Sequence, residues 1–211
     1  MSANPKTLLA AGHKTHYHEA GQGEALFLLH GSGPGVSGWA NWANTVPVFA
    51  DRWRVVVPDI AGFGFTEFKE DAKYDIKLWV SHLLGIMDAL DIEKASFIGN
   101  SFGGALAIGL AVFAPERVKK LVLLGTPAGE FVQTPGLRGA WEYEPSLDNM
   151  RELMKLFPYD VSLITDAMVQ ARYEASARPG AQQALRKLIP QPAVDGPTLV
   201  KGFPAAALAK I

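Results

Sequence analysis

Ser101 is the residue whose surroundings in the sequence most clearly indicate chemistry. It lies in Gly99-Asn100-Ser101-Phe102-Gly103, a G-x-S-x-G pattern between the apolar run 95–98 and small, apolar residues at helical spacing. The pattern is typical of a nucleophile elbow, a tight turn that exposes the serine Oγ at the N-terminus of a helix. The amide N–H of Phe102 is then free to donate to an oxyanion. The same residues also fit a glycine-rich turn with a capping serine, and the motif alone leaves both interpretations open.

A second glycine-rich segment, HGSGPG, begins at His30. It follows Ala25–His30, a continuous apolar run that predicts a buried parallel strand. One interpretation is that its backbone supplies the second N–H that an oxyanion hole needs. The other is a plain loop.

Further apolar runs indicate the elements that position both segments. Residues 54–58 and 118–125 predict two more strands, a hairpin over residues 7–19 turns near Gly12, and residues 76–90 form an amphipathic helix. Strands that alternate with helices predict a mostly parallel α/β sheet with active residues at the carboxyl ends of its strands. Ser101 and the HGSGPG loop both lie at such ends.

The character of the sequence changes from residue 129 to residue 201, where helical segments are separated by prolines. We interpret this part as a helical cap, with Ser146 and Thr165 as helix N-caps, that closes over the strand ends. On a helix over residues 166–175, Arg172 shares an apolar stripe with Met168, Ala171 and Ala175. An arginine there is either a structural or snorkelling side chain or a bidentate clamp for a substrate carboxylate.

The histidines offer few candidates for catalysis or metal binding. His13, His16 and His18 lie on the predicted hairpin, where no acidic or thiolate residue is near in sequence, so we expect solvated strand positions and no metal site. His82 lies on the flank of the helix at 76–90, which favours a position on the helix surface. We assign neither His82 nor His30 as a catalytic base.

Composition excludes several classes of function. The 211 residues carry a formal net charge of −1, with dispersed lysines and arginines, so no nucleic-acid or anionic-membrane partner is expected. The N-terminal stretch MSANPKTLLAAGHK has only a short apolar run, which does not reach the length of a signal-peptide core, no stretch approaches the length of a membrane span, and the chain has no cysteine. These features are typical of a cytoplasmic enzyme.

Four stretches of the chain resemble the meta-cleavage product hydrolases of the α/β-hydrolase superfamily, most closely the 2-hydroxymuconic semialdehyde hydrolases: HGSGPGVSGWANW, PDIAGFGFTE, IMDALDIEKASFIGNSFGGALAI and LRGAWEYEPSLDNMRELM. The resemblance implies a serine hydrolase of aromatic catabolism that cleaves a carbon–carbon bond in 2-hydroxy-6-oxo-dienoates. It implies the nucleophile Ser101, an oxyanion hole from the amides of Ser32 and Phe102, and the substrate-binding residues Asn41, Asn100 and Arg172. It further implies a homo-oligomer without metal or organic cofactor. A carboxylesterase with the same serine, or a non-catalytic ligand-binding fragment of this fold, are the alternatives.

The chain departs from this family in one respect. The resemblance implies a triad aspartate and histidine after later strands, but none of the five histidines follows Ser101. We therefore expect residues 1–128 to form the N-terminal part of the core, 129–201 the cap, and 202–211 a return toward a truncated core. Such a chain is either a fragment of a longer enzyme or a product that cannot run the reaction alone. The strand at 118–124 would then be left as an unpaired apolar edge.

Overall fold

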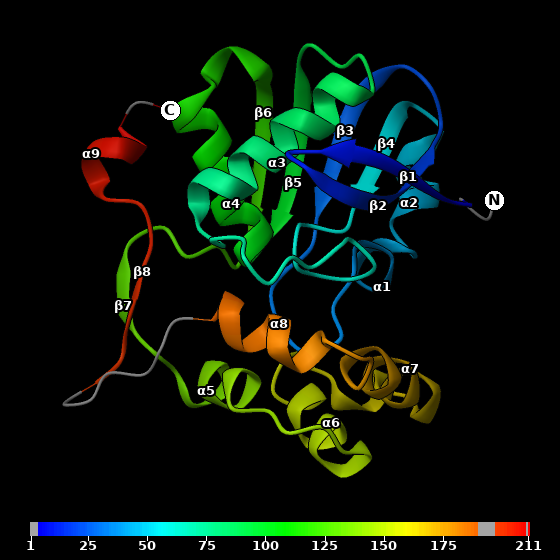
Figure 1. The fold of residues 1–211 in the computed structure, drawn as a ribbon, viewed down its shortest axis with the longest axis vertical. Helices are drawn as coiled ribbons and strands as arrows, with labels where there is room; N and C mark the ends of the chain where they lie inside the picture. Colours follow the sequence, from blue (N-terminus) through cyan, green and yellow to red (C-terminus); the bar gives the residue numbers. More distant parts are fainter. Residues whose placement is uncertain (1–3, 190–196, 210) are drawn as a thin grey trace.

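A six-stranded sheet with helices on both faces forms the upper part of the molecule, and a group of helices lies across one end of it (Figure 1). The computed structural model describes residues 4–189, 197–209 and 211. The strands of this sheet are β1 (Pro5–Ala10), β2 (His13–Ala20), β3 (Glu24–Leu29), β4 (Trp53–Pro58), β5 (Ala95–Asn100) and β6 (Val118–Leu124).

The strand order is β1-β2-β4-β3-β5-β6. β1 and β2 form the predicted hairpin, with Gly12 in the turn at φ +78°, and β2 pairs antiparallel with β4. The pairs β3–β4, β3–β5 and β5–β6 are parallel. The mostly parallel α/β sheet predicted from the sequence is therefore confirmed.

The central strands are buried on both faces because helices cover each side. Side chains at alternate positions, such as Phe27 and Leu29, pack toward α3 (Ile76–Ala89) and α4 (Phe102–Phe113). Their neighbours Leu26 and Leu28 pack toward α1 (Gly38–Trp42) and α2 (Val46–Ala50). Most residues of the two edge strands, β1 and β6, are exposed.

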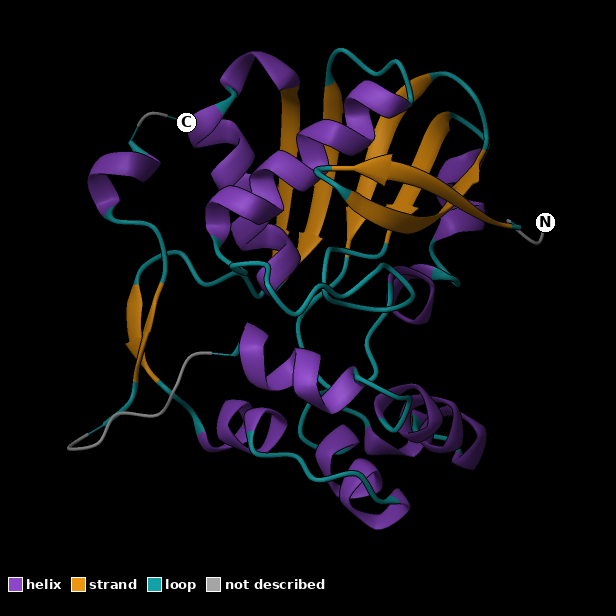
Figure 2. Cartoon of the chain, in the orientation of Figure 1, coloured by secondary structure: helices purple, strands orange, loops and turns teal. Residues whose placement is uncertain are grey.

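Four helices lie beyond the carboxyl ends of the parallel strands (Figure 2). They are α5 (Pro135–Trp141), α6 (Leu147–Met154), α7 (Asp166–Ser176) and α8 (Ala181–Leu188), and the first three contribute to a small apolar cluster that includes Met150 and Val169. Ser146 and Thr165 cap α6 and α7 through their side chains, as predicted.

Two short strands within the predicted helical region were not foreseen. β7 (Glu130–Val132) and β8 (Leu199–Lys201) pair antiparallel beside the sheet, and the chain continues to α9 (Ala205–Leu208), which packs near α4. The short 3₁₀ turns η1 (Pro115–Arg117) and η2 (Val161–Leu163) complete the elements. No helix in the described part of the chain is long and apolar enough to cross a bilayer.

Candidate active site

The turn between β5 and α4 holds Ser101 in a strained backbone conformation. Its φ of +51° and ψ of −113° lie where a residue with a Cβ atom costs on the order of 1–3 kcal/mol. The Ser101 amide donates to the carbonyl of Leu124 on β6 at 2.7 Å, which fixes the corner. Strand, sharp turn and helix thus follow one another as the G-x-S-x-G pattern predicts.

The glycines beside Ser101 are required by close packing. A Cβ atom on Gly99 would lie 2.5 Å from the Cα of Gly104, and one on Gly103 would lie 2.5 Å from the carbonyl oxygen of Leu29. Real side chains do not approach that closely. The glycines therefore let the start of α4 sit directly against the ends of β3 and β5.

The loop after β3 runs alongside this corner, and a shared acceptor joins the two. The side-chain oxygen of Asn41 accepts hydrogen bonds from the Gly31 amide at 3.2 Å and from the Asn100 side chain at 3.1 Å. Asn41 and Asn100, both predicted site residues, are thus brought together. The bond fixes the spacing between Ser32, next to Gly31, and Ser101, next to Asn100.

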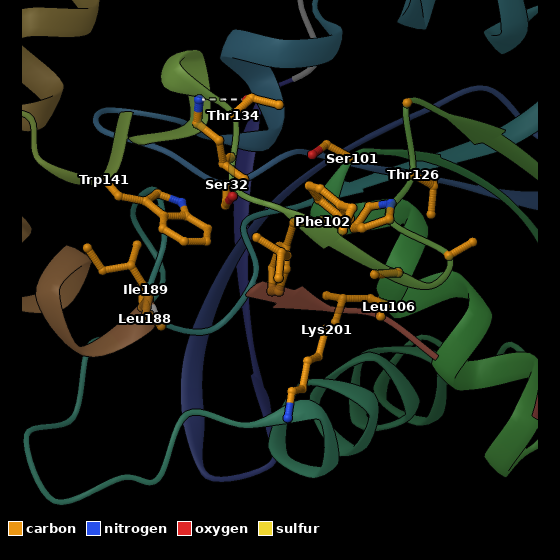
Figure 3. A pocket seen from close by; sticks show the side chains of 18 of the residues that line it. Ser32, Ser101, Phe102, Leu106, Thr126, Thr134, Trp141, Leu188, Ile189 and Lys201 are labelled. Atoms are coloured by element: carbon orange, nitrogen blue, oxygen red, sulfur yellow. Dashed lines mark hydrogen bonds between the residues drawn. The ribbon is translucent and has the colours of Figure 1, made fainter. Parts of the chain in front are cut away.

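Ser32, Ser101 and Phe102 line one cavity of about 750 Å³ (Figure 3). The Phe102 amide belongs to the first turn of α4, where no intrahelical acceptor exists. Trp141 and Ile189 close the cavity from the side of α5–α8, and Leu106 lies on the side of α4. A serine hydroxyl at a helix N-terminus, facing a largely apolar chamber, can attack a carbonyl carbon and stabilise the resulting oxyanion.

Trp141 and Thr126 are among the lining residues that the sequence did not indicate. Trp141 follows a stretch with no periodic signal, although it stands in the LRGAWEYEP segment that carried the resemblance. Thr126 follows β6, and its buried Oγ1 has no hydrogen-bond partner in the described structure. An isolated threonine in a loop gives no signal in the sequence.

Arg172 lies on α7 and reaches the loop after β3 rather than the cavity wall itself. Its Nε donates to the carbonyl of Pro34 at 3.1 Å, and its guanidinium lies 5.6 Å from the centre of the Phe157 ring. Burial lowers the pKa of this guanidinium. Among the residues that the structure describes, no carboxylate forms an ion pair with the Arg172 guanidinium. Burying a guanidinium costs free energy unless strong hydrogen-bond acceptors surround it. The site therefore favours an anion.

The predicted apolar face of α7, which included Arg172, is wrong by one residue along the helix. The buried face of α7 is formed by Val169, Arg172, Tyr173 and Ser176, whereas Met168 is 48% exposed and Ala171 also faces solvent. The reason is that α7 packs on α6 through Val169. Arg172 nevertheless lies on the buried side.

The surface position predicted for His82 is also wrong, since its side chain is fully buried. The β1–β2 hairpin folds over α3, so the flank of the helix is covered. The Ala61 amide donates to Nδ1 of His82 at 3.4 Å, and Nε2 lies 2.8 Å from the Thr15 hydroxyl. Desolvation, with smaller contributions from His13 and His30, lowers the pKa of His82 to about 3.

The hairpin histidines are not solvated either. His13 and His18 are buried, and His16 is paired through Nδ1 with Asp59 at 2.8 Å. β2 is an inner strand of the sheet, and the loop after β4 packs against it, which the hairpin sequence alone does not reveal. Among the described residues no group of three potential ligands can hold a metal ion.

The ring nitrogens of His13, His16, His30 and His82 have hydrogen-bond partners other than Ser101, and the His18 ring stacks on Trp39. His30 lies nearest in sequence to the loop, but its Nε2 accepts from the Ile60 amide at 3.0 Å and its Nδ1 lies 2.7 Å from the carbonyl of Gly31. A serine hydroxyl needs an adjacent base to be nucleophilic near neutral pH. The histidines present in the chain do not supply it.

Comparison with known proteins adds to this geometry. The family model for the alpha/beta hydrolase fold matches residues 24–191. The 2-hydroxy-6-oxo-2,4-heptadienoate hydrolase of Pseudomonas putida strain F1 is 46% identical over 187 residues, which are 89% of this chain and 68% of the relative. The 2-hydroxymuconate semialdehyde hydrolase of Pseudomonas sp. strain CF600 is 44% identical over 194 residues, covering 90% of this chain and 69% of the relative.

A solved structure agrees with these matches. A meta-cleavage product hydrolase from Pseudomonas fluorescens IP01, a serine-to-alanine variant complexed with acetates, superposes with a TM-score of 0.86 at 49% identity. The match covers 89% of this chain and 69% of that structure. The chain thus spans somewhat more than two thirds of the length of these relatives.

Proposed function

The chain belongs to the α/β-hydrolase family and, within it, to the meta-cleavage product hydrolases; from that premise we propose that it binds a 2-hydroxy-6-oxo-dienoate and presents Ser101 to its C6 carbonyl. Hydrolysis of such a compound breaks the carbon–carbon bond next to that carbonyl and adds water, giving a carboxylic acid and a shorter dienoate. Two relatives that are 46% and 44% identical to this chain are named as hydrolases of such compounds.

At the reacting end of the substrate, Ser101 is the proposed nucleophile and the amides of Ser32 and Phe102 are the proposed oxyanion hole. The supporting observation is that these three residues line one cavity, with Ser101 held in a strained turn at the start of α4. A preformed pair of N–H donors stabilises developing negative charge without reorganisation.

At the other end of the substrate, Arg172 is the proposed clamp for the carboxylate, and Asn41 and Asn100 are proposed to bind the substrate as well. The observation that carries this assignment is the buried Arg172 guanidinium, whose only hydrogen-bond acceptor among the described residues is the carbonyl of Pro34. A planar carboxylate satisfies the remaining donors through two parallel bonds.

We further propose that residues 129–201 act as a cap that excludes water from the cavity, since α5 and α8 contribute to its wall. A homo-oligomer and a cytoplasmic location are likewise proposals, supported by the family resemblance and by the absence of cysteine. Because no histidine of this chain faces Ser101, the 211-residue polypeptide should bind a dienoate without turning it over.

The experiment that tests the proposal measures binding of 2-hydroxy-6-oxo-2,4-heptadienoate and of its neutral methyl ester through the absorbance of the dienoate. Arg172→Lys should weaken binding of the acid about tenfold, because an ammonium does not form two parallel bonds, and should change binding of the ester much less. Arg151→Lys is the matched control, since Arg151 pairs with Asp166 on the exposed surface of the same helical region. Equal losses on both ligands would identify Arg172 as structural.

A further inference from the structure

A buried carboxylate, that of Asp59, lies outside the set of residues assigned above. Asp59 follows β4 directly and its side chain is fully buried. Unpaired, a charge at such a position would cost several kcal/mol. Its partners therefore define what it holds in place.

The two oxygens of Asp59 join three separate segments of the chain. Oδ1 accepts from the Gly38 amide at 2.6 Å, and Oδ2 accepts from the Phe65 amide at 2.8 Å and from Nδ1 of His16 at 2.8 Å. Burial by itself raises the pKa of this carboxyl, but the bond from His16, the proximity of His30 and the two amide bonds outweigh it, so the pKa is lowered. The ionised carboxylate is thus the form that the fold stabilises.

One of these segments is the loop that carries Ser32. The loop runs from His30 to Gly38 and contains Gly33 at φ +141° and Gly35 at φ +66°, backbone conformations that residues with a Cβ atom rarely adopt. Its anchors are the bond from Gly31 to Asn41, the bond from Arg172 to Pro34, and the bond from Gly38 to Asp59. Asp59 therefore fixes the end of the loop where α1 begins.

A second segment is the turn that receives the helical region. Arg178, between α7 and α8, donates to the carbonyl of Gly64 at 2.6 Å and lies 4.1 Å from the centre of the Phe65 ring. Gly64 packs directly on Asp59, since a Cβ atom there would lie 2.3 Å from the carboxylate. The same side chain thus supports both the loop and the contact with α7–α8.

We propose that Asp59, held by His16, is a positioning residue that sets the Ser32 amide at the distance from Ser101 that an oxyanion requires. The inference rests on the proposed function in assigning the Ser32 amide to the oxyanion hole. Asp59 itself touches neither Ser101 nor the cavity wall, so it acts through the loop.

The test separates oxyanion binding from carboxylate binding in the 211-residue protein. Phenylboronic acid is the first probe: the Ser101 Oγ forms a bond to trigonal boron, its proton goes to solvent, and the negatively charged tetrahedral adduct places a boron-bound hydroxyl oxygen at the N–H groups, observed by ¹¹B NMR. 2-Hydroxy-6-oxo-2,4-heptadienoate is the second probe and reports on Arg172. Hydrogen exchange of residues 31–38 reports on the loop without any ligand.

Asp59→Asn should weaken phenylboronate binding at least about tenfold, change dienoate binding less than about threefold, and speed exchange in residues 31–38. His16→Ala should act in the same direction, and His16→Asn should restore binding because its amide nitrogen can donate from the position of Nδ1. Asp88→Asn is the matched control: Asp88 pairs with Arg117 on the surface of α3, and its loss should leave all three readouts unchanged.

Equal weakening of both probes, or unchanged exchange in residues 31–38, would overturn the positioning role. If Asp59→Asn does not fold, the comparison of His16→Ala with His16→Asn decides it, and failure of rescue counts against it. If the wild-type protein forms no adduct, Ser101 either is unreactive without an adjacent base or is not the nucleophile, and hydrogen exchange alone decides whether Asp59 positions the loop.

Discussion

The strained backbone conformation of Ser101 is the clearest indication that the turn between β5 and α4 serves catalysis rather than stability. The residue lies in a region of φ and ψ that suits glycine, and its neighbours fix it there through the bond to Leu124 and the packing of α4. A serine that served only as a helix cap would adopt extended backbone angles and accept a bond from the helix, whereas Ser101 makes no such side-chain cap.

The first prediction compares two replacements of Ser101. Ser101→Gly should raise the free energy of unfolding by about 1 kcal/mol or more, because glycine removes the strain, while Ser101→Ala should change it by only a few tenths. Urea unfolding followed by circular dichroism measures both. Both variants should lose the phenylboronate adduct and keep dienoate binding. Equal stability of the two variants would mean that the turn is not strained.

The second prediction concerns His82, whose pKa of about 3 lies below the ordinary value of 6.5. Between about pH 6.5 and 3, His82 therefore binds a proton in the unfolded chain but not in the folded chain. The free energy of unfolding is highest above about pH 6.5 and decreases as the pH falls toward 3. His30, whose pKa is also lowered by burial, and Asp59 add to this acid sensitivity in the same direction.

Urea unfolding at a series of pH values below 6.5 measures this decline. His82→Gln should be less stable than wild type at neutral pH but lose stability less steeply on acidification, by up to about 1.4 kcal/mol per pH unit. Parallel stability curves for the two proteins would show that His82 does not titrate with unfolding.

At the scale of elements, the close contact of α4 with β3 sets the geometry of the site. The third prediction is that Gly103→Ala destabilises the fold by about 1–3 kcal/mol, because the new methyl group would meet the carbonyls of Leu29 and His30, which are backbone atoms that cannot move away. Thermal melting measures the change. The phenylboronate adduct should weaken as well, since α4 would shift from the loop.

Gly136→Ala, on α5, is the matched control. Nothing lies closer than 3.8 Å to the position of its Cβ atom, and alanine favours a helix, so stability should stay unchanged or rise by up to about 1 kcal/mol. Two equal and small changes would contradict the packing argument for α4.

The elements that could be predicted are those whose buried positions produce a pattern of apolar residues within a single stretch of sequence. The apolar runs of β3 and β4, the stripe of α3 and the glycines around Ser101 each carry a local signal, and each was confirmed. The pairing of β7 with β8 joins segments that lie far apart in the chain, and neither segment has a pattern of its own.

Among single residues, the errors share a cause. The predicted positions of His82, His16 and Met168 came from the pattern of the helix or strand that carries each residue. The exposure of each side chain depends instead on which other element packs over it. The contacts of Asp59 were missed for the same reason: a lone aspartate after a buried strand suggests a loop residue, and only the structure shows Gly38, Phe65 and His16 bonded to it.

At the scale of the whole molecule, the sheet has two edge strands within the described residues. β1 forms one edge and β6 the other, and β6 pairs only with β5 in the part of the chain that the structure describes. β1 packs against α3, whereas β6 presents Val122, Leu123 and Leu124, which are 49%, 40% and 45% exposed. A flat apolar edge with unpaired N–H and C=O groups favours pairing with another chain.

The last prediction is therefore that the 211-residue polypeptide self-associates through β6, as the expected unpaired edge implied. Sedimentation velocity at several concentrations should show association that Val122→Lys reduces, because a charged side chain on the edge must be desolvated when two edges pair. Val48→Lys is the matched control: Val48 is 72% exposed on α2, away from either edge, so the same change in charge there should leave association as it is. Equal reductions by both variants would assign the effect to net charge, and a wild-type protein that stays monomeric at every concentration would show that the edge is not a site of pairing.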